Sequence, residues 1–191
     1  MFILKTAIRD HLKNPLYHNA YYLILNAGGG AVLGFAFWIV VARFYSPSEV
    51  GLASALISAV TLASTIARLG MNFGLIRFLS SARDKAPAMI NSSFTIGTLA
   101  SLFTGLMFLA GVQYWAPDML FVQKNLLYAA VFIVCAVIFN ISVLLDTIFV
   151  ALRTAKYTLI KNLIEPGIKI LLIFVFVFLG AFDIIYFTCM S

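Results

Sequence analysis

The chain has 191 residues, of which 63% are hydrophobic and only 10% are charged, and its formal net charge is +6. Soluble domains carry about 25% charged residues, and they cannot hide this much apolar surface in an interior. The composition therefore excludes an ordinary soluble domain and indicates a chain whose solvent is lipid. The basic residues fall between apolar segments, so we expect no nucleic-acid partner.

Residues 1–18 form a polar, basic tail. Lys5, Arg9 and Lys13 recur every four residues and share one helical face, while apolar residues gather on another. This pattern predicts a short amphipathic helix that lies on the cytoplasmic membrane surface and binds anionic lipid headgroups. Asn14-Pro15 ends it, because the residue before proline disfavours the helical region.

Residues 19–191 read as a partial amino-terminal bundle of transmembrane helices. Five apolar segments are long enough to cross a bilayer, at about 21–42, 50–79, 89–114, 125–150 and 159–181. The residues after Ala181 read as the start of a sixth span, but ten residues make only about 15 Å of helix, half of the hydrocarbon thickness. We therefore predict an all-α integral membrane protein, and we expect the chain to be an amino-terminal fragment of a longer one.

Local signals refine these spans. Gly30 and Gly34 give a face of small residues that predicts close approach of another helix. Ser46-Pro47-Ser48-Glu49 predicts the start of the second span, with a capping box. At roughly 45 Å that span is longer than the membrane core, so we expect it to bend at Gly70 and Gly74. The two cysteines, Cys135 and Cys189, are expected to be buried thiols rather than a disulfide.

Orientation follows from the lysines and arginines. Nine of them lie in or beside the tail and the loops after spans two and four, and only Arg43 and Lys124 lie in the opposite loops. Cytoplasmic loops carry the excess of such residues. We therefore predict a multi-pass protein of the cell membrane with a cytoplasmic amino terminus.

Arg68 and Lys169 are not explained by topology. Each lies about 15 Å from the cytoplasmic end of its span. A charge at that depth costs about 3 kcal/mol on insertion scales, so it should face a wet cavity or a partner. We expect a cationic cavity that contains both residues. Arg77 is nearer the interface, where its side chain can reach water, and we expect no such role for it.

The fifth span adds further candidates for a substrate-binding cavity. Lys161, Glu165 and Lys169 are four residues apart and share one helical face, and Pro166 interrupts the hydrogen bonds of the helix. Kinked, charged helices often line water-filled cavities in transporters. Glu165 neutralising the two lysines within the helix is the structural alternative. Asp146 is expected to pair with Lys161 or another basic residue.

Three asparagines fall within the predicted spans: Asn26, Asn72 and Asn140. Hydrogen bonding between helices is the default role for each. Asn72, close to the Gly70 bend, is also a candidate cavity residue.

Three segments of the chain carry a family resemblance. The first is the opening helix, NAGGGAVLGFAFWIVVARFYSP. The second is SPSEVGLASALISAVTLASTIARLGMNFGLIRFLS, with Glu49 at its start, a Leu-Gly break at Gly70 and Arg77 near its end. The third is the junction of the fourth and fifth helices, LLDTIFVALRTAKYTLIKNLIEPGIKILL, which includes Lys169. These segments resemble the corresponding helices of polysaccharide and lipid-linked oligosaccharide flippases of the multidrug/oligosaccharidyl-lipid/polysaccharide (MOP) exporter superfamily, and the resemblance covers nearly the whole chain.

The resemblance implies two helical bundles that open alternately to the two sides of the membrane. The implied cargo is a glycan on a polyprenyl phosphate or diphosphate, and basic cavity residues suit such a cargo. This chain would supply most of one bundle, so its implied partner is the missing carboxy-terminal bundle or a second copy. Family members often carry an acid before the Leu-Gly break, where this chain has Arg68, which leaves the local charge of the cavity open.

Three alternatives remain at the level of sequence. A multidrug or cation antiporter of the same superfamily would favour an acidic cavity, and a non-transporting assembly subunit would pair its basic residues with acids on a partner. A membrane-embedded enzyme is the third, but the sequence contains no HExxH or GxSxG motif and no acidic cluster suited to a metal. We therefore expect neither an enzyme nor a cofactor.

Overall fold

The computed structural model describes the backbone of residues 15–179 and the side chains of residues 19–82 and 84–168. This part of the chain is all-helical and contains no strand. Seven α-helices and three short 3-10 helices follow one another: α2 (Pro15–Phe44), α3 (Pro47–Ala67), α4 (Met71–Phe78), η1 (Leu79–Ser81), η2 (Arg83–Lys85), α5 (Ala86–Trp115), η3 (Pro117–Met119), α6 (Leu120–Lys124), α7 (Leu126–Ala151) and α8 (Ala155–Leu179).

Four of the helices are long and apolar enough to cross a membrane, over Asn19–Phe44, Pro47–Ala67, Ala86–Trp115 and Leu126–Ala151. The chain is therefore a multi-pass membrane protein. The side chains of α8 are described only to Ile168, so the fifth span stays a prediction. The amphipathic tail before Pro15 and the start of a sixth span lie outside the described residues.

The start of α3 confirms the predicted capping box. Ser46 donates its backbone N–H to Glu49 Oε2 at 2.8 Å, and Glu49 N–H donates back to Ser46 Oγ at 3.4 Å. Pro47 takes the first helical position, where its missing N–H leaves no bond unmade. Local sequence alone therefore sets where this span begins.

The predicted long second span is divided between α3 and α4. Leu69 and Gly70 both have positive φ, 48° and 77°, which ends α3 and starts α4 in a new direction. Left-handed backbone suits glycine, which has no Cβ to clash with the carbonyl. The bend expected at Gly70 is confirmed, whereas Gly74 lies inside α4 and does not bend the chain.

Replacing Gly70 by alanine is expected to destabilise the protein by roughly 1 kcal/mol, because the new Cβ must occupy the left-handed region. Gly74→Ala is the matched control, since a Cβ there meets nothing within 4 Å and the helical backbone is kept. The measurement is the thermal unfolding midpoint of both variants in detergent. Equal midpoints would show that the positive φ of Gly70 is not required.

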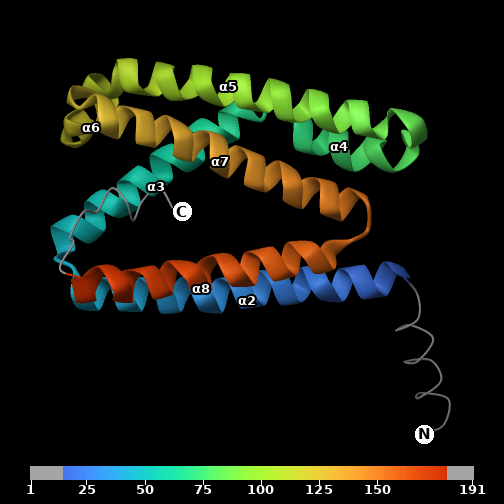
Figure 1. Ribbon diagram of the computed structural model, residues 1–191, viewed down its shortest axis with the longest axis horizontal. Coiled ribbons are helices and arrows are strands. Elements are labelled where there is room, and N and C mark those ends of the chain that lie inside the picture. Colours follow the sequence, from blue (N-terminus) through green and yellow to red (C-terminus); the bar gives the residue numbers. More distant parts are fainter. Residues whose placement is uncertain (1–14, 180–191) are drawn as a thin grey trace, which may run out of the picture.

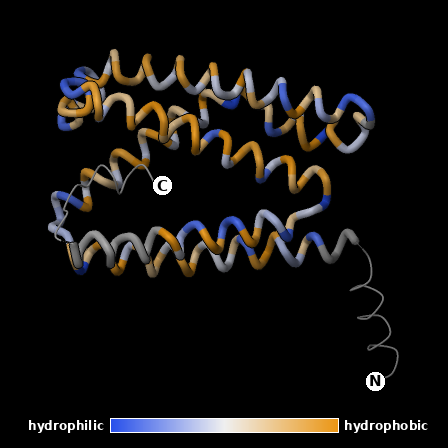
Figure 2. The backbone as a smooth tube through the Cα atoms, viewed as in Figure 1, coloured by the Kyte–Doolittle hydropathy of each residue, from blue (hydrophilic) through white to orange (hydrophobic). Residues whose placement is uncertain are grey.

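The helices divide into two groups (Figure 1). In one group α3, α5 and α7 pack together, with α4 against α7. In the other, α2 and α8 lie side by side over much of their length. These two helices are parallel and start at the same end, where Asn19 Oδ1 accepts a hydrogen bond from Ala155 N–H at 3.0 Å. Figure 2 shows hydrophilic positions at the helix ends and also along the described part of α8.

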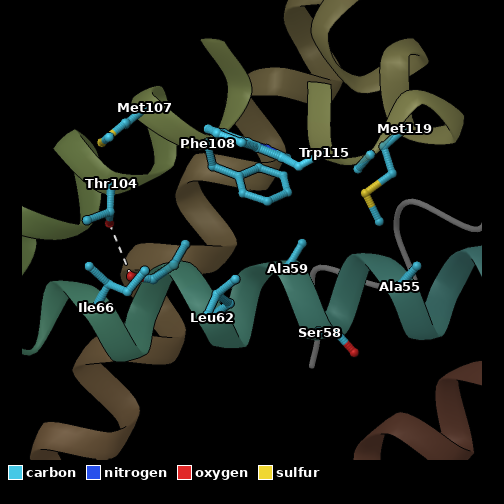
Figure 3. A pocket seen from close by; sticks show the side chains of 12 residues that line it. Ala55, Ser58, Ala59, Leu62, Ile66, Thr104, Met107, Phe108, Trp115 and Met119 are labelled. Carbon is cyan, nitrogen blue, oxygen red and sulfur yellow. Dashed lines mark hydrogen bonds between the residues drawn. The ribbon is translucent and has the colours of Figure 1, made fainter. Parts of the chain in front are cut away.

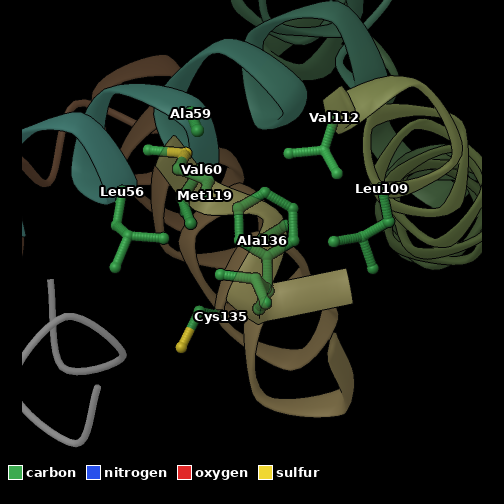
Figure 4. Packing of buried hydrophobic residues seen from close by; sticks show 10 residues of the cluster. Leu56, Ala59, Val60, Leu109, Val112, Met119, Cys135 and Ala136 are labelled. Carbon is green, nitrogen blue, oxygen red and sulfur yellow. The ribbon is translucent and has the colours of Figure 1, made fainter. Parts of the chain in front are cut away.

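Small and apolar side chains fill the core of the first group (Figure 4). Leu56 and Val60 of α3 meet Val112 of α5 and Ala136 of α7, all at most 4% exposed. Cys135 is buried in the same cluster, but it is disulfide-bonded, so the expectation of a free thiol was wrong. The other cysteine of the sequence, Cys189, lies outside the described residues.

Buried hydrogen bonds also join α3, α5 and α7. Asn140 Nδ2 donates to Gly97 O and to Ser101 Oγ, both at 2.8 Å. Ser64 Oγ donates to Ala136 O at 3.0 Å, and Thr104 Oγ1 donates to Ala63 O at 3.2 Å. The role predicted for Asn140, hydrogen bonding between helices, is therefore confirmed. Such bonds hold helices together where lipid offers no polar alternative.

The close approach of another helix to α2 occurs at a different glycine from those predicted. A Cβ at Gly29 would lie 2.8 Å from Leu163 Cδ2 of α8, whereas a Cβ at Gly30 or Gly34 would meet nothing within 4 Å. Within the described residues, no helix makes the close approach predicted at Gly30 and Gly34. The face that meets α8 is decided by the rotation of α2 about its axis, which the glycine spacing does not specify.

Candidate functional site

An ion pair joins α7 to α8. Lys161 Nζ lies 2.8 Å from Asp146 Oδ2, and it also donates to the carbonyl and hydroxyl oxygens of Ser142, at 3.0 and 2.6 Å. The two charged side chains are about one quarter exposed, at 26% for Lys161 and 23% for Asp146. The predicted pairing of Asp146 with Lys161 is thus confirmed, and three oxygen atoms surround the ammonium group.

The local structure explains why these residues meet. Ser142 and Asp146 are four residues apart and therefore share one face of α7. Arg153, with φ of 57°, and a hydrogen bond from Thr154 N–H to Phe149 O fold the chain sharply between the helices. The first turns of α8 then lie against the last turns of α7, and Lys161 reaches back to the carboxylate.

A polar cavity of about 360 Å³ lies between α2 and α8, beside the ion pair. Its lining residues are Asn26, Ala27 and Gly30 of α2, and Asn162, Glu165 and Pro166 of α8. Asn162 connects the cavity to the ion pair, because its Nδ2 donates to Asp146 Oδ2 at 3.4 Å. Asn26 and Asn162 are level with each other, since each follows by seven residues one of the partners of the Asn19–Ala155 hydrogen bond.

Arg68 lies at the carboxyl end of α3, where it is the C-cap residue. Its Nη2 donates to Thr65 Oγ1 at 2.6 Å, while its Nη1 is buried and has no hydrogen-bond partner among the described residues. Arg68 does not line the cavity between α2 and α8. The side chain of Lys169 lies outside the described residues, so the shared cavity of Arg68 and Lys169 stays a prediction.

The remaining sequence candidates are placed apart from the ion pair. Asn72 is half-buried in α4, and within the described part of the chain it makes no hydrogen bond to the other candidates. Arg77 is exposed and its guanidinium lies 5.4 Å from the centre of the Phe78 ring. The structure therefore groups Asp146, Lys161 and Glu165 on the α7 and α8 side.

A second, larger cavity is apolar and lies between α3 and α5 (Figure 3). Its volume is about 620 Å³, and Leu62, Met107, Phe108 and Trp115 are among its walls. The hydroxyl of Thr104 is already bonded to Ala63 O, and the hydroxyl of Ser58 to Ser54 O. Both hydroxyl groups therefore already donate their hydrogen bonds within the protein. The other walls of the cavity are mainly apolar, which suits a hydrocarbon chain as its occupant.

Sequence reasoning missed Ser142, Asn162 and the cavity role of Asn26. Ser142 lies four residues before Asp146, which is a signal that the helical period offers. Asn162 follows Lys161 directly and therefore points about 100° away from it on the helix. Its contact with Asp146 depends on how α7 and α8 cross, so no spacing in the sequence predicts it.

The polysaccharide biosynthesis protein family matches this chain over residues 16–189. The chain belongs to this family. The match confirms the resemblance to the flippases of the MOP exporter superfamily, and it includes both groups of helices and the Asp146–Lys161 pair. Comparisons with curated proteins and with solved structures find no match.

Proposed function

We propose that this chain is part of a transporter that flips lipid-linked oligosaccharide or polysaccharide precursors across the cytoplasmic membrane by alternating access. The observation that carries the proposal is the family match over residues 16–189 of a chain with four apolar helices of spanning length. The ion pair of Asp146 with Lys161 and the adjoining polar cavity support it, because ionisable groups within membrane helices mark substrate pathways.

The proposed transporter contains a second helical bundle. Alternating access requires two bodies that rock about a site between them, and the described helices pack as one α3–α5–α7 group with α2 and α8 beside it. We propose that the second body is a carboxy-terminal bundle or another copy of this chain. In either case Arg68 and Lys169 face the space between the two bodies and bind the phosphate of the cargo, while Asn72, Glu165, Lys161 and Asp146 line its wall.

Capture of the cargo tests this proposal. The 191-residue chain in bilayer nanodiscs should be labelled by a photoactivatable polyprenyl diphosphate that carries a glycan, and unlabelled lipid of the same kind should compete. Arg68→Ala and Lys169→Ala should each lower labelling by about tenfold, which corresponds to about 1.4 kcal/mol and the loss of a charge-assisted hydrogen bond. Arg77→Ala is the control and should label almost normally, because its side chain is exposed beside Phe78. Normal labelling of both Arg68→Ala and Lys169→Ala would overturn the phosphate role.

One observation favours a cation antiporter as the second candidate. Glu165 lines the described polar cavity, and a carboxylate there suits a cationic substrate. Efflux of a fluorescent lipophilic cation from cells that express the chain, lost in Glu165→Gln, would support the antiporter. Unchanged cation accumulation together with lipid labelling would favour the flippase.

We propose that the amino terminus is cytoplasmic, on the basis of the basic loops. In a background without native cysteines, cysteines introduced at Ser81 and Thr154 should resist an impermeant thiol reagent applied outside the cell. A cysteine at Ser48, which is exposed between Ser46 and Glu49 of the capping box, should react. Modification of Ser81→Cys and Thr154→Cys, with protection of Ser48→Cys, would reverse the orientation.

A further inference from the structure

The polar cavity between α2 and α8 is lined by amide, carboxylate and apolar groups and does not include Arg68. Lys161, which lies one turn before Glu165 on α8, is held by Asp146 and Ser142 on the α7 side. We propose that this cavity binds one sugar ring of the glycan, an uncharged group rich in hydroxyls, and not the phosphate. The assignment rests on the proposed function and adds that the sugar and the phosphate of the cargo bind at separate places.

The cavity contains hydrogen-bond acceptors that lack their ordinary donors. Asn26 Oδ1 is buried without a hydrogen-bond partner among the described residues. Pro166 has no N–H, so the carbonyl of Asn162 loses the donor that position 166 would otherwise supply. A buried acceptor without a donor costs about 1–3 kcal/mol, so the ligand that fits is one that brings O–H or N–H groups.

Sugar hydroxyls supply such donors and also accept from an asparagine amide. An ionised phosphate offers acceptors only, so it cannot donate to Asn26 Oδ1. The choice between the sugar and the phosphate is therefore made by the acceptors of the cavity that need a donor, Asn26 Oδ1 and the carbonyl of Asn162.

The size of the cavity fits a single ring. Its volume of about 360 Å³ is near the lower end of small-molecule sites, which span roughly 300–1,000 Å³. Gly30 leaves part of this space open, because a Cβ at Gly30 would meet nothing within 4 Å. A larger side chain at this position would occupy the cavity without a clash at its Cβ.

The test uses the 191-residue chain in nanodiscs and two lipids, a polyprenyl diphosphate that carries one N-acetylglucosamine and the same polyprenyl diphosphate without a sugar. Gly30→Leu should weaken binding of the sugar-bearing lipid by about tenfold or more, through lost hydrogen bonds and lost space. It should leave the affinity for the bare lipid unchanged within about twofold. Asn26→Ala, which removes the acceptor without filling the cavity, should shift affinity in the same selective way.

Gly28→Leu is the matched control. A Cβ at Gly28 of α2 would also meet nothing within 4 Å, but Gly28 does not line the cavity. It should bind both lipids as the unmodified chain does. The assignment would be overturned if Gly30→Leu and the unmodified chain had equal affinity for the sugar-bearing lipid. It would also be overturned if Gly30→Leu lost affinity for both lipids to the same extent. If the unmodified chain binds neither lipid, the proposed function fails and the assignment falls with it.

Discussion

Asp146→Asn is expected to destabilise the protein by roughly 2–3 kcal/mol, because it leaves the Lys161 ammonium without its counter-ion inside the membrane helices. Lys161→Gln should cost a similar amount by leaving Asp146 charged and unpaired. The double variant should recover most of the loss, since a pair of neutral amides needs no compensating charge. The measurement is thermal unfolding of the three variants in detergent, with membrane accumulation as a second readout.

The control for this cycle is Lys156→Gln, which makes the same change of charge on an exposed side chain that lies over the Tyr157 ring. Its effect should be within about 0.5 kcal/mol, as is usual for surface substitutions. If the stability losses of the two single variants simply add in the double variant, Asp146 and Lys161 do not stabilise each other. Other contacts would then have to hold α8 against α7.

Gly97→Val should force α5 away from α7. A Cβ at Gly97 would lie 2.9 Å from Leu144 Cδ1 and 3.1 Å from Asn140 Nδ2, and valine adds two methyl groups beyond it. The backbone would have to shift and lengthen the hydrogen bonds from Asn140 to Gly97 O and Ser101 Oγ. Overpacking of this kind costs about 1–3 kcal/mol, and the lost bonds add about 1 kcal/mol each.

Thermal unfolding again provides the measurement, and Gly51→Val is the matched control. Gly51 lies in α3, and a Cβ there meets nothing within 4 Å. Its midpoint should therefore remain close to that of the unmodified protein. If Gly97→Val unfolds at the same temperature as Gly51→Val, the contact of α5 with α7 at this level is looser than the structure indicates.

The sequence by itself determined the features that depend on neighbours along the chain. Composition identified lipid as the solvent, Ser46 and Glu49 marked the start of α3, and Gly70 marked the break before α4. These are local effects: a capping box needs four consecutive residues, and a left-handed residue needs only its own φ. The Asp146–Lys161 pair could also be predicted from the sequence, because only a short turn separates the two helices that carry these residues.

Only the tertiary structure decided which helices meet and with which faces. The helical period indicates that Lys161 and Glu165 share a face of α8, yet Lys161 bonds to α7 whereas Glu165 lines a cavity against α2. Likewise Gly29 meets Leu163 while Gly30 borders the cavity. The physical reason is that the rotation and crossing of each helix are set by contacts between residues that are distant in the sequence, such as Gly29 and Leu163, and in lipid every face of these spans is nearly as apolar as every other.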